Sequence, residues 1–413
     1  MRQFLEIIHL LSNPTAILPN SDQQKLIHEF ERLKESESGW KECVEFLLSD
    51  DGLNDQTKFF CMQVIENFLK TRYKNNNVPQ TDQDLVKKFM SYWLHSQLNR
   101  KANEKNFLNK KAAQLFALVS LIDFPNRWQN FFNDLMVTCQ WSIGNADFYL
   151  KCLMAIHSEI VDREIPHTPE ELNLITYYKD SIRKHCVNEL VESWFLLLKE
   201  HSAKNPEITC QTLEVIGAYI SWIEINLIVN SRFLEFFSYA LNNSDLRETA
   251  CGCLEEIIDK GMDFGAKLKL IDYLWTNVIH QNALMLEHQI SLHNNDEDNC
   301  DYLLQFGKLL NTIGSNLFMG WQKMYKKEPE LGSQFFQSIE NKIPFALRLL
   351  NHSDDDISEC VSEYCMNYIS ILKVNKIQTR EQQLNIESML GIVINKTKYD
   401  SSFNFDNELI SSL

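Results

Sequence analysis

Apolar residues recur at the helical period of 3.6 along nearly the whole chain, and this periodicity limits the fold more than any other feature. Between residues 57 and 73, Phe60, Val64 and Phe68 stand at steps of four. Residues 209–225 are apolar over more than half of the helix circumference, so other elements must cover such a helix on several sides. The chain is therefore expected to be an all-α protein.

Glycine and proline, which punctuate most other folds, are scarce. The 413 residues include only 12 Gly and 9 Pro, whereas these two residues make up roughly 12% of an average chain. This deficit argues against sandwiches and barrels, which need many turn residues. It also argues against Rossmann and P-loop domains, whose phosphate-binding turns need clustered glycines. Helices joined by short polar turns fit the composition better.

Helix-start signals divide the chain into pairs of helices. A capping side chain precedes a helical pattern at Ser21-Asp22, Asn54-Asp55, Thr81-Asp82, Thr168-Pro169 and Ser244-Asp245. The predicted pairs are 22–35 with 39–49, 55–75 with 81–98, 102–122 with 126–138, 146–162 with 169–200, 206–225 with 228–241, 245–260 with 263–281, 299–322 with 330–350, and 355–373 with 379–397. About eight antiparallel pairs of this length match the period of HEAT and armadillo repeats. They predict an α-α superhelix, a HEAT-repeat solenoid with first helices outside and second helices inside, and the alternative is an irregular all-helical domain.

The net charge of −16 is confined to one part of the chain. Residues 1–140 hold 17 basic and 17 acidic residues, whereas residues 141–413 hold 23 basic and 39 acidic residues. A neutral first third joined to an acidic remainder predicts surfaces that meet different partners.

Sequence signatures of catalysis, metal binding and membrane insertion are missing. The chain has no GxxxxGK[ST], GxGxxG, GxSxG, HExxH or CxxC pattern. Its 11 Cys are an odd number and mostly lie in apolar helical stretches, which is typical of buried thiols in the reducing cytosol or nucleus. No run of about 20 apolar residues exists. We therefore expect a protein that is not an enzyme and has no cofactor, no metal and no membrane insertion.

The first candidate binding surface is the aromatic segment 124–132, and the second is basic. Pro125 ends the preceding helix, Trp128 and Phe132 are better explained by packing between repeats, and Arg127 is the residue expected to face a partner. The segment 100–127 is rich in basic residues and holds only Glu104 and Asp123 as acidic residues. Its cations are Arg100, Lys101, Lys105, Lys110, Lys111 and Arg127. Such charges suit nucleic-acid phosphates or an acidic protein, and solvated helix ends are the alternative interpretation.

The third candidate surface is acidic. Asp296-Glu297-Asp298 falls in a polar linker, and Asp354, Asp355 and Asp356 lie at a turn between helices. Three adjacent carboxylates lack the alternating ligands of an EF-hand, so a calcium site is not expected. The alternatives are negative charge at a helix N-terminus and a surface for a basic partner.

Several stretches resemble exportin-t, the tRNA export receptor family of the importin-β superfamily. They occur in the family's order from about residue 10 to residue 406 and include 58–61 (KFFC), 109–118 (NKKAAQLFAL), 160–163 (IVDR), 190–194 (LVESW), 209–223, 246–248 (LRE), 260–263 (KGMD) and 354–358 (DDDIS). No single string decides the match, and their shared order makes it specific.

The resemblance implies a HEAT-repeat receptor that binds RanGTP and tRNA together in the nucleus and passes through the nuclear pore by contact with its proteins. It implies a monomeric receptor found in nucleus and cytoplasm, with Ran-binding repeats in residues 1–140 and exportin-type repeats in 141–413. The expected Ran-binding residues are Lys41, Lys87, Lys88, Arg127, Trp128, Asp354, Asp355 and Asp356. The expected tRNA-binding residues are Arg100, Lys101, Lys105, Lys110 and Lys111, which Ran could also contact.

Family members are more than twice as long as this chain, so we expect it to correspond to their amino-terminal half. A carrier of protein cargo and a passive HEAT scaffold are the competing hypotheses. Both keep the helical repeats and change what the repeats bind.

Overall fold

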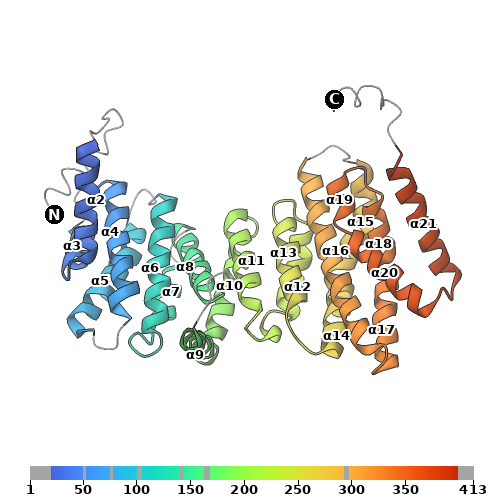
Figure 1. The fold of residues 1–413 in the computed structure, drawn as a ribbon, viewed down its shortest axis with the longest axis horizontal. Coiled ribbons are helices and arrows are strands. Elements are labelled where there is room, and N and C mark those ends of the chain that lie inside the picture. The colour runs from blue at the N-terminus through green and yellow to red at the C-terminus, as the bar shows by residue number, and fades with distance from the viewer. Residues whose placement is uncertain are drawn as a thin grey trace. The chain divides into compact units, whose positions relative to one another are not determined.

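The computed structural model describes residues 20–49, 53–74, 78–99, 105–139, 143–161, 168–292 and 297–398. Every regular element in these ranges is a helix, which confirms the all-α prediction (Figure 1). The chain forms two compact units, residues 1–223 and 224–413. The division at residue 140, drawn from charge and resemblance, stays a prediction about partners. No helix in the described part of the chain is long and apolar enough to cross a membrane.

Unit 1 stacks helices in two layers. Its elements are α2 (Asn20–Glu35), α3 (Gly39–Ser49), α4 (Asp55–Phe68), the π-helix η1 (Leu69–Tyr73), α5 (Gln80–Asn99), α6 (Asn106–Asp123), α7 (Phe131–Cys139), α8 (Ile143–Val161), α9 (Pro169–His185), α10 (Val187–His201) and α11 (Pro206–Ile220). In one layer α2, α4, α6, α8 and α11 each contact the next, and in the other α3, α5, α7 and α10 do the same. This is the repeat-on-repeat packing expected of a HEAT stack.

Unit 2 continues the pattern within itself. Its elements are η2 (Ile225–Leu227), α12 (Ser231–Leu241), α13 (Arg247–Asp259), α14 (Phe264–Leu274), the π-helix η3 (Trp275–Ile279), α15 (His280–Leu292), α16 (Glu297–Met324), α17 (Pro329–Glu340), α18 (Ile343–Leu350), α19 (Asp355–Glu359), α20 (Ser362–Asn375) and α21 (Arg380–Lys396). One layer runs α13, α16, α20, and the other runs through η3 and α15 to α18 and α21.

Buried apolar side chains hold both stacks together, and polar bridges fix how neighbouring first-layer helices align. Trp40, Trp93, Trp194 and Tyr219 are at most 2% exposed. Between successive first-layer helices, an amide repeatedly donates to a carboxylate. These bonds are Gln211 to Asp147 (3.1 Å), Gln305 to Glu255 (2.9 Å), Asn316 to Asp259 (2.7 Å) and Asn311 to Glu363 (3.2 Å). Hydrophobic burial supplies the stability, and the directional bonds set the helix register.

The predicted capping signals are confirmed at two helices and wrong at a third, because α13 begins at Arg247 after Leu246, which makes no side-chain cap, and not directly after Ser244-Asp245. The Asn54 side chain accepts a hydrogen bond from the Thr57 N–H at the start of α4. Thr168 forms a capping box with Glu171 at the start of α9, with Pro169 in the first turn. These side chains satisfy N–H groups that would otherwise have no partner at the helix ends.

Three predicted helices are interrupted in the structure, and a fourth begins late. The helix expected over 169–200 breaks at Cys186, where φ is −153°, and the helix expected over 330–350 breaks between Glu340 and Ile343. The helix expected over 355–373 divides into α19 and α20. The helix expected from residue 126 starts at Phe131, because the N–H groups of Arg127 and Trp128 turn back to the Asp123 carbonyl.

Three glycines let other helices approach the long helix α16 closely. A Cβ at Gly314 would lie 2.2 Å from Cδ2 of Tyr364, and one at Gly320 would lie 2.3 Å from Cε1 of Phe335. A Cβ at Gly307 would lie 2.1 Å from Sγ of Cys360. The absence of side chains at these positions lets Phe335 of α17, Tyr364 of α20 and Cys360, which follows α19, rest against the α16 backbone.

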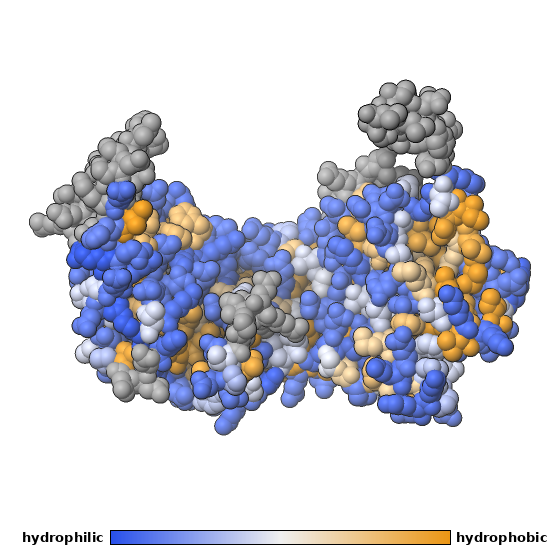
Figure 2. Space-filling model, viewed as in Figure 1, coloured by the Kyte–Doolittle hydropathy of each residue, from blue (hydrophilic) through white to orange (hydrophobic). Residues whose placement is uncertain are grey.

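Apolar side chains remain exposed on the last helix pair, α20–α21, and on the segment that joins the two helices. Val374, Ile377, Leu390, Val393 and Ile394 are each at least half exposed, and Figure 2 shows hydrophobic residues gathered over α21. On their other side, α20 and α21 pack on α16 and α18. Within the described ranges, no further helix packs on the outward face of this pair, whereas a following helix covers each earlier pair of unit 2.

Candidate partner-binding site

A buried carboxylate at the end of α6 organises the first predicted binding surface. The Asp123 side chain is inaccessible to solvent; its Oδ2 accepts a hydrogen bond from the Tyr73 hydroxyl at 2.8 Å, and its Oδ1 lies 3.6 Å from Nη1 of Arg127. Burial raises the pKa of Asp123, and the contacts with Tyr73 and Arg127 oppose that rise. The carboxylate thus ties η1, α6 and the following turn into one support.

The same support holds three of the residues predicted to bind Ran. Lys87 of α5 donates from Nζ to the Arg127 carbonyl at 2.6 Å, and its ammonium lies 5.9 Å from the centre of the Trp128 ring. Nε1 of Trp128 donates to Asp134 at 2.7 Å, which keeps the half-buried ring at the surface. We call Tyr73, Lys87, Asp123, Arg127 and Trp128 the Arg127 cluster.

Two more predicted Ran-binding lysines lie on the second-layer helices near this cluster. Lys41 of α3 pairs through Nζ with Oδ1 of Asp82, in the first turn of α5, at 2.5 Å. Lys88 is exposed, adjoins Lys87 on α5, and makes no polar contact within the described part of the chain. Lys41 lies on α3, Lys87 and Lys88 lie on α5, and Arg127 and Trp128 lie in the turn before α7; these three helices are consecutive members of one layer.

The predicted tRNA-binding residues occupy the other layer, and most of those described are already paired. Lys105 lies 2.7 Å from Asp55, and Lys111, whose side chain is 11% exposed, bonds to Glu66. Burial acts to raise the pKa of Glu66, but hydrogen bonds from Lys111 and Lys70 outweigh it and the pKa is lowered. Arg100 and Lys101 lie outside the described residues.

Lys110 differs from Lys105 and Lys111 because it is exposed, has no ion-pair partner among the described residues and borders a groove. The groove has a volume of about 460 Å³ and crosses α6, α8 and α11 within unit 1. Its walls also carry Lys151, Glu207, Gln211 and Glu214. The charges are mixed in sign, so this part of the surface is not a continuous cationic track.

The predicted acidic residues belong to unit 2 and begin α19. Asp354 caps this short helix by accepting from the Asp356 N–H at 2.9 Å. Asp355 is 93% exposed and lies 3.1 Å from Nζ of Lys396. In the described ranges, no group of three or more His, Cys, Asp or Glu side chains is arranged so that it could hold a metal ion. The other acidic run is only partly described, because residue 296 lies outside those ranges.

Sequence reasoning missed the partners that hold the basic residues. Glu66, Asp55 and Asp82 lie 45, 50 and 41 residues from the lysines they pair with. No local spacing links such residues. The contact of Tyr73 with Asp123 was also missed. The pairing of Asp123 with Arg127 did have a local signal, because an arginine four residues after an aspartate at a helix end can turn back to it.

Comparisons with known proteins agree with the resemblance seen in the sequence. Residues 105–254 match the family described as Exportin 1-like protein. Exportin-T from Danio rerio is 38% identical, and that from Homo sapiens 37% identical, over 394 residues. Exportin-T from Dictyostelium discoideum is 28% identical over 385 residues, which are 92% of this chain and 34% of that protein.

A solved structure gives the same fold. The exportin Cse1 in its cargo-free, cytoplasmic state aligns with 95% of this chain and 43% of its own, at a TM-score of 0.50 and 13% identity. The chain spans about two fifths of the vertebrate relatives it matches. Across 94% of its residues, the chain is similar to exportin-T.

Proposed function

We propose that this chain is part of a nuclear export receptor that binds RanGTP and tRNA cooperatively and shuttles between nucleus and cytoplasm through the nuclear pore. The observation that carries the proposal is the homology to exportin-T over 94% of the chain. The two-layered helical stack supports it, because such stacks offer long surfaces for macromolecular partners. The role needs no catalytic group.

We further propose that Ran contacts the α3–α5–α7 layer of unit 1 and the acidic start of α19. The Arg127 cluster supports the first contact, because it holds an arginine, a lysine and an indole ring together at the surface on a rigid base. Arginine and tryptophan are the residue types that most often anchor protein interfaces. Asp354, Asp355 and Asp356 are exposed carboxylates, which would attract a basic patch of Ran.

The test of the proposed function is a pull-down with GTP-loaded and GDP-loaded Ran, each with and without tRNA. RanGTP retained more strongly in the presence of tRNA is the expected result. Equal retention of the two nucleotide states would contradict the proposal. RanGTP binding that responds to a protein cargo and ignores tRNA would favour the protein-cargo carrier, and no Ran binding at all would favour the passive scaffold.

Lys88→Glu is expected to weaken RanGTP binding by about tenfold or more, because it reverses an exposed charge in the proposed interface. The change touches no internal contact, so the free energy of unfolding should not move. Isothermal titration measures the affinity, and Lys199→Glu, an exposed lysine on α10, is the matched control. Equal affinity in the two variants would remove α5 from the interface.

Lys110→Gln is expected to lower the salt dependence of tRNA binding by about one unit of the log–log slope, since an unpaired lysine displaces about one counterion from a phosphate. Lys111→Gln should change the slope less, because Glu66 already holds that ammonium. Filter binding across a range of KCl concentrations measures both slopes. A larger effect at Lys111 than at Lys110 would show that tRNA displaces Glu66.

A further inference from the structure

A second groove lies within unit 2, apart from every residue discussed above. It has a volume of about 920 Å³ and runs between α14–η3 on one side and α17 on the other. Its walls carry polar side chains between apolar ones such as Leu268 and Trp275, and its floor contains a lysine side chain that is only 2% exposed. A cavity of this size with a buried charge beneath it needs an explanation beyond the gap between two helices.

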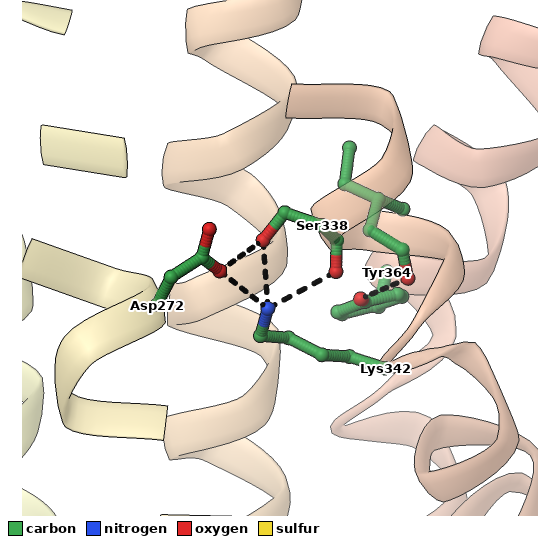
Figure 3. Close-up of polar contacts among 5 residues, drawn as sticks. Asp272, Ser338, Lys342 and Tyr364 are labelled. Carbon is green, nitrogen blue, oxygen red and sulfur yellow. Dashed lines mark hydrogen bonds and ion pairs between the residues drawn. The ribbon is translucent and has the colours of Figure 1, made fainter. Parts of the chain in front are cut away.

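The buried lysine fixes a carboxylate in the groove (Figure 3). Nζ of Lys342 donates to Oδ1 of Asp272 at 3.0 Å, and to the Oγ and the carbonyl of Ser338 at 2.7 Å and 3.1 Å. Oγ of Ser338 also donates to Oδ1 of Asp272 at 2.6 Å. All three donors of the ammonium therefore have acceptors inside the protein.

This arrangement leaves the other oxygen of Asp272 for a ligand. Oδ2 has no hydrogen-bond partner among the described residues, and the side chain is 48% exposed. Its position is set in advance, because Oδ1 is held by two donors. A fixed acceptor loses less entropy on binding than a mobile one does, so Asp272 is an efficient anchor for a group that donates hydrogen bonds.

The α17 wall carries a row of unpaired amides. Gln334, Gln337 and Asn341 are exposed, line the groove, and have no side-chain partner within the described ranges. Gln334 and Gln337 belong to α17 and Asn341 directly follows it with helical backbone angles, so their spacing of three and four puts them on one face. The row is about 10 Å long at 1.5 Å per residue, which is about three residues of extended chain. Each amide can both donate to and accept from a peptide backbone.

The opposite wall, formed by α14 and η3, carries the aromatic ring of Tyr273 and one cation, Lys269. Tyr273 is 47% exposed and lies beside Thr276 and Lys269. A phenol ring next to a fixed carboxylate suits a guanidinium or ammonium group, which both would attract. Unit 2 holds 27 acidic and 16 basic residues, a net charge of −11. Such a field repels phosphodiesters and attracts basic segments.

We propose that this groove binds an extended, neutral-to-basic peptide segment, with its main chain on the amides of α17 and an arginine or lysine side chain on Oδ2 of Asp272. The amides recognise backbone and are tolerant of sequence, whereas Asp272 and Tyr273 select a cationic side chain. The site shares no residue with the contacts proposed for Ran and tRNA, so it would give unit 2 a second partner.

The test uses the full chain and a fluorescein-labelled nonapeptide of glycine and serine with one central arginine, titrated by fluorescence anisotropy. Gln337→Leu/Asn341→Leu is expected to weaken binding about tenfold or more, the equivalent of two lost hydrogen bonds. Gln383→Leu, an exposed amide on α21, is the control and should leave the affinity unchanged. The same peptide with N-methylated backbone amides should also bind at least tenfold more weakly.

Asp272→Asn separates side-chain recognition from backbone recognition. It should remove the preference for the arginine peptide over its norleucine analogue while leaving the norleucine peptide's affinity within twofold. Wild-type affinity in the Gln337→Leu/Asn341→Leu variant would overturn the proposal. So would a single-stranded RNA nonamer that displaces the peptide from the wild-type chain.

Discussion

Arg127→Met is expected to lower the free energy of unfolding of unit 1 by about 3 kcal/mol, because it leaves the Asp123 carboxylate buried without its cation. The methionine keeps most of the side-chain volume, so the loss reports on charge more than on packing. Urea denaturation, with hydrogen exchange of α5, α6 and α7 to localise the effect, measures it. Arg380→Ala is the control, because this arginine is 65% exposed in its pair with Glu387 and should contribute less than about 1 kcal/mol.

The loss of unfolding free energy in Arg127→Met should depend on pH, and the burial of Asp123 determines whether it grows or shrinks as the pH rises. Burial raises the native pKa of Asp123, so the native state binds a proton at pH values where the unfolded state has released it. Stability therefore falls as the pH rises from the unfolded pKa through the native one. Without Arg127 the native pKa rises further. The difference between variant and wild type should be largest near neutrality and shrink toward pH 4; a difference independent of pH would show that the guanidinium acts through packing alone.

Gly314→Ala is expected to lower the free energy of unfolding of unit 2 by about 2 kcal/mol, the cost of overpacking a tight contact. The added methyl group would meet the Tyr364 ring at 2.2 Å. That ring has little room to move, because it is 1% exposed and its hydroxyl donates to the Ile339 carbonyl at 2.9 Å. Denaturant titration followed by near-ultraviolet circular dichroism measures both the stability and the packing of the tyrosine.

Gly391→Ala is the matched control for this substitution. Gly391 lies within α21, and a Cβ there meets no atom within 4 Å. Alanine should therefore stabilise the helix by roughly 0.5–1 kcal/mol through its better helix propensity. If both alanines shifted stability in the same direction, propensity and not the contact with Tyr364 would govern α16.

The helical stack could be predicted from sequence because its signals are local. Periodicity, the Asn54 cap and the Thr168 capping box all act within a few residues, and each is found where expected. The break at Cys186 could not be predicted in this way, since neither glycine nor proline marks it. The break before Ile343 had a signal, Pro344, but the bond from Lys342 in that turn to the distant Asp272 had none.

The candidate sites were less predictable, because pairing decides which charges are available. A run of basic residues on α6 looks cationic in sequence, yet Glu66 and Asp55 engage two of its lysines from α4. Conversely, the fixed carboxylate of Asp272 and the amides of α17 carry no recognisable motif. Their meeting depends on the packing of helices about 65 residues apart in the chain, which periodicity does not encode.

The exposed apolar face of α20–α21 has a consequence for how stability is distributed in unit 2. In a linear array each member gains from an interface on either side, and the total is a sum of intrinsic and nearest-neighbour terms. Among the described elements, α16 has neighbours on both sides, whereas α20 and α21 pack against one side only. The pair is therefore stabilised by one nearest-neighbour interface only. The free energy needed to unfold it locally should be lower than that for any interior pair. Whatever covers Leu390 and Ile394 would act as a cooperative cap and stabilise helices it never touches.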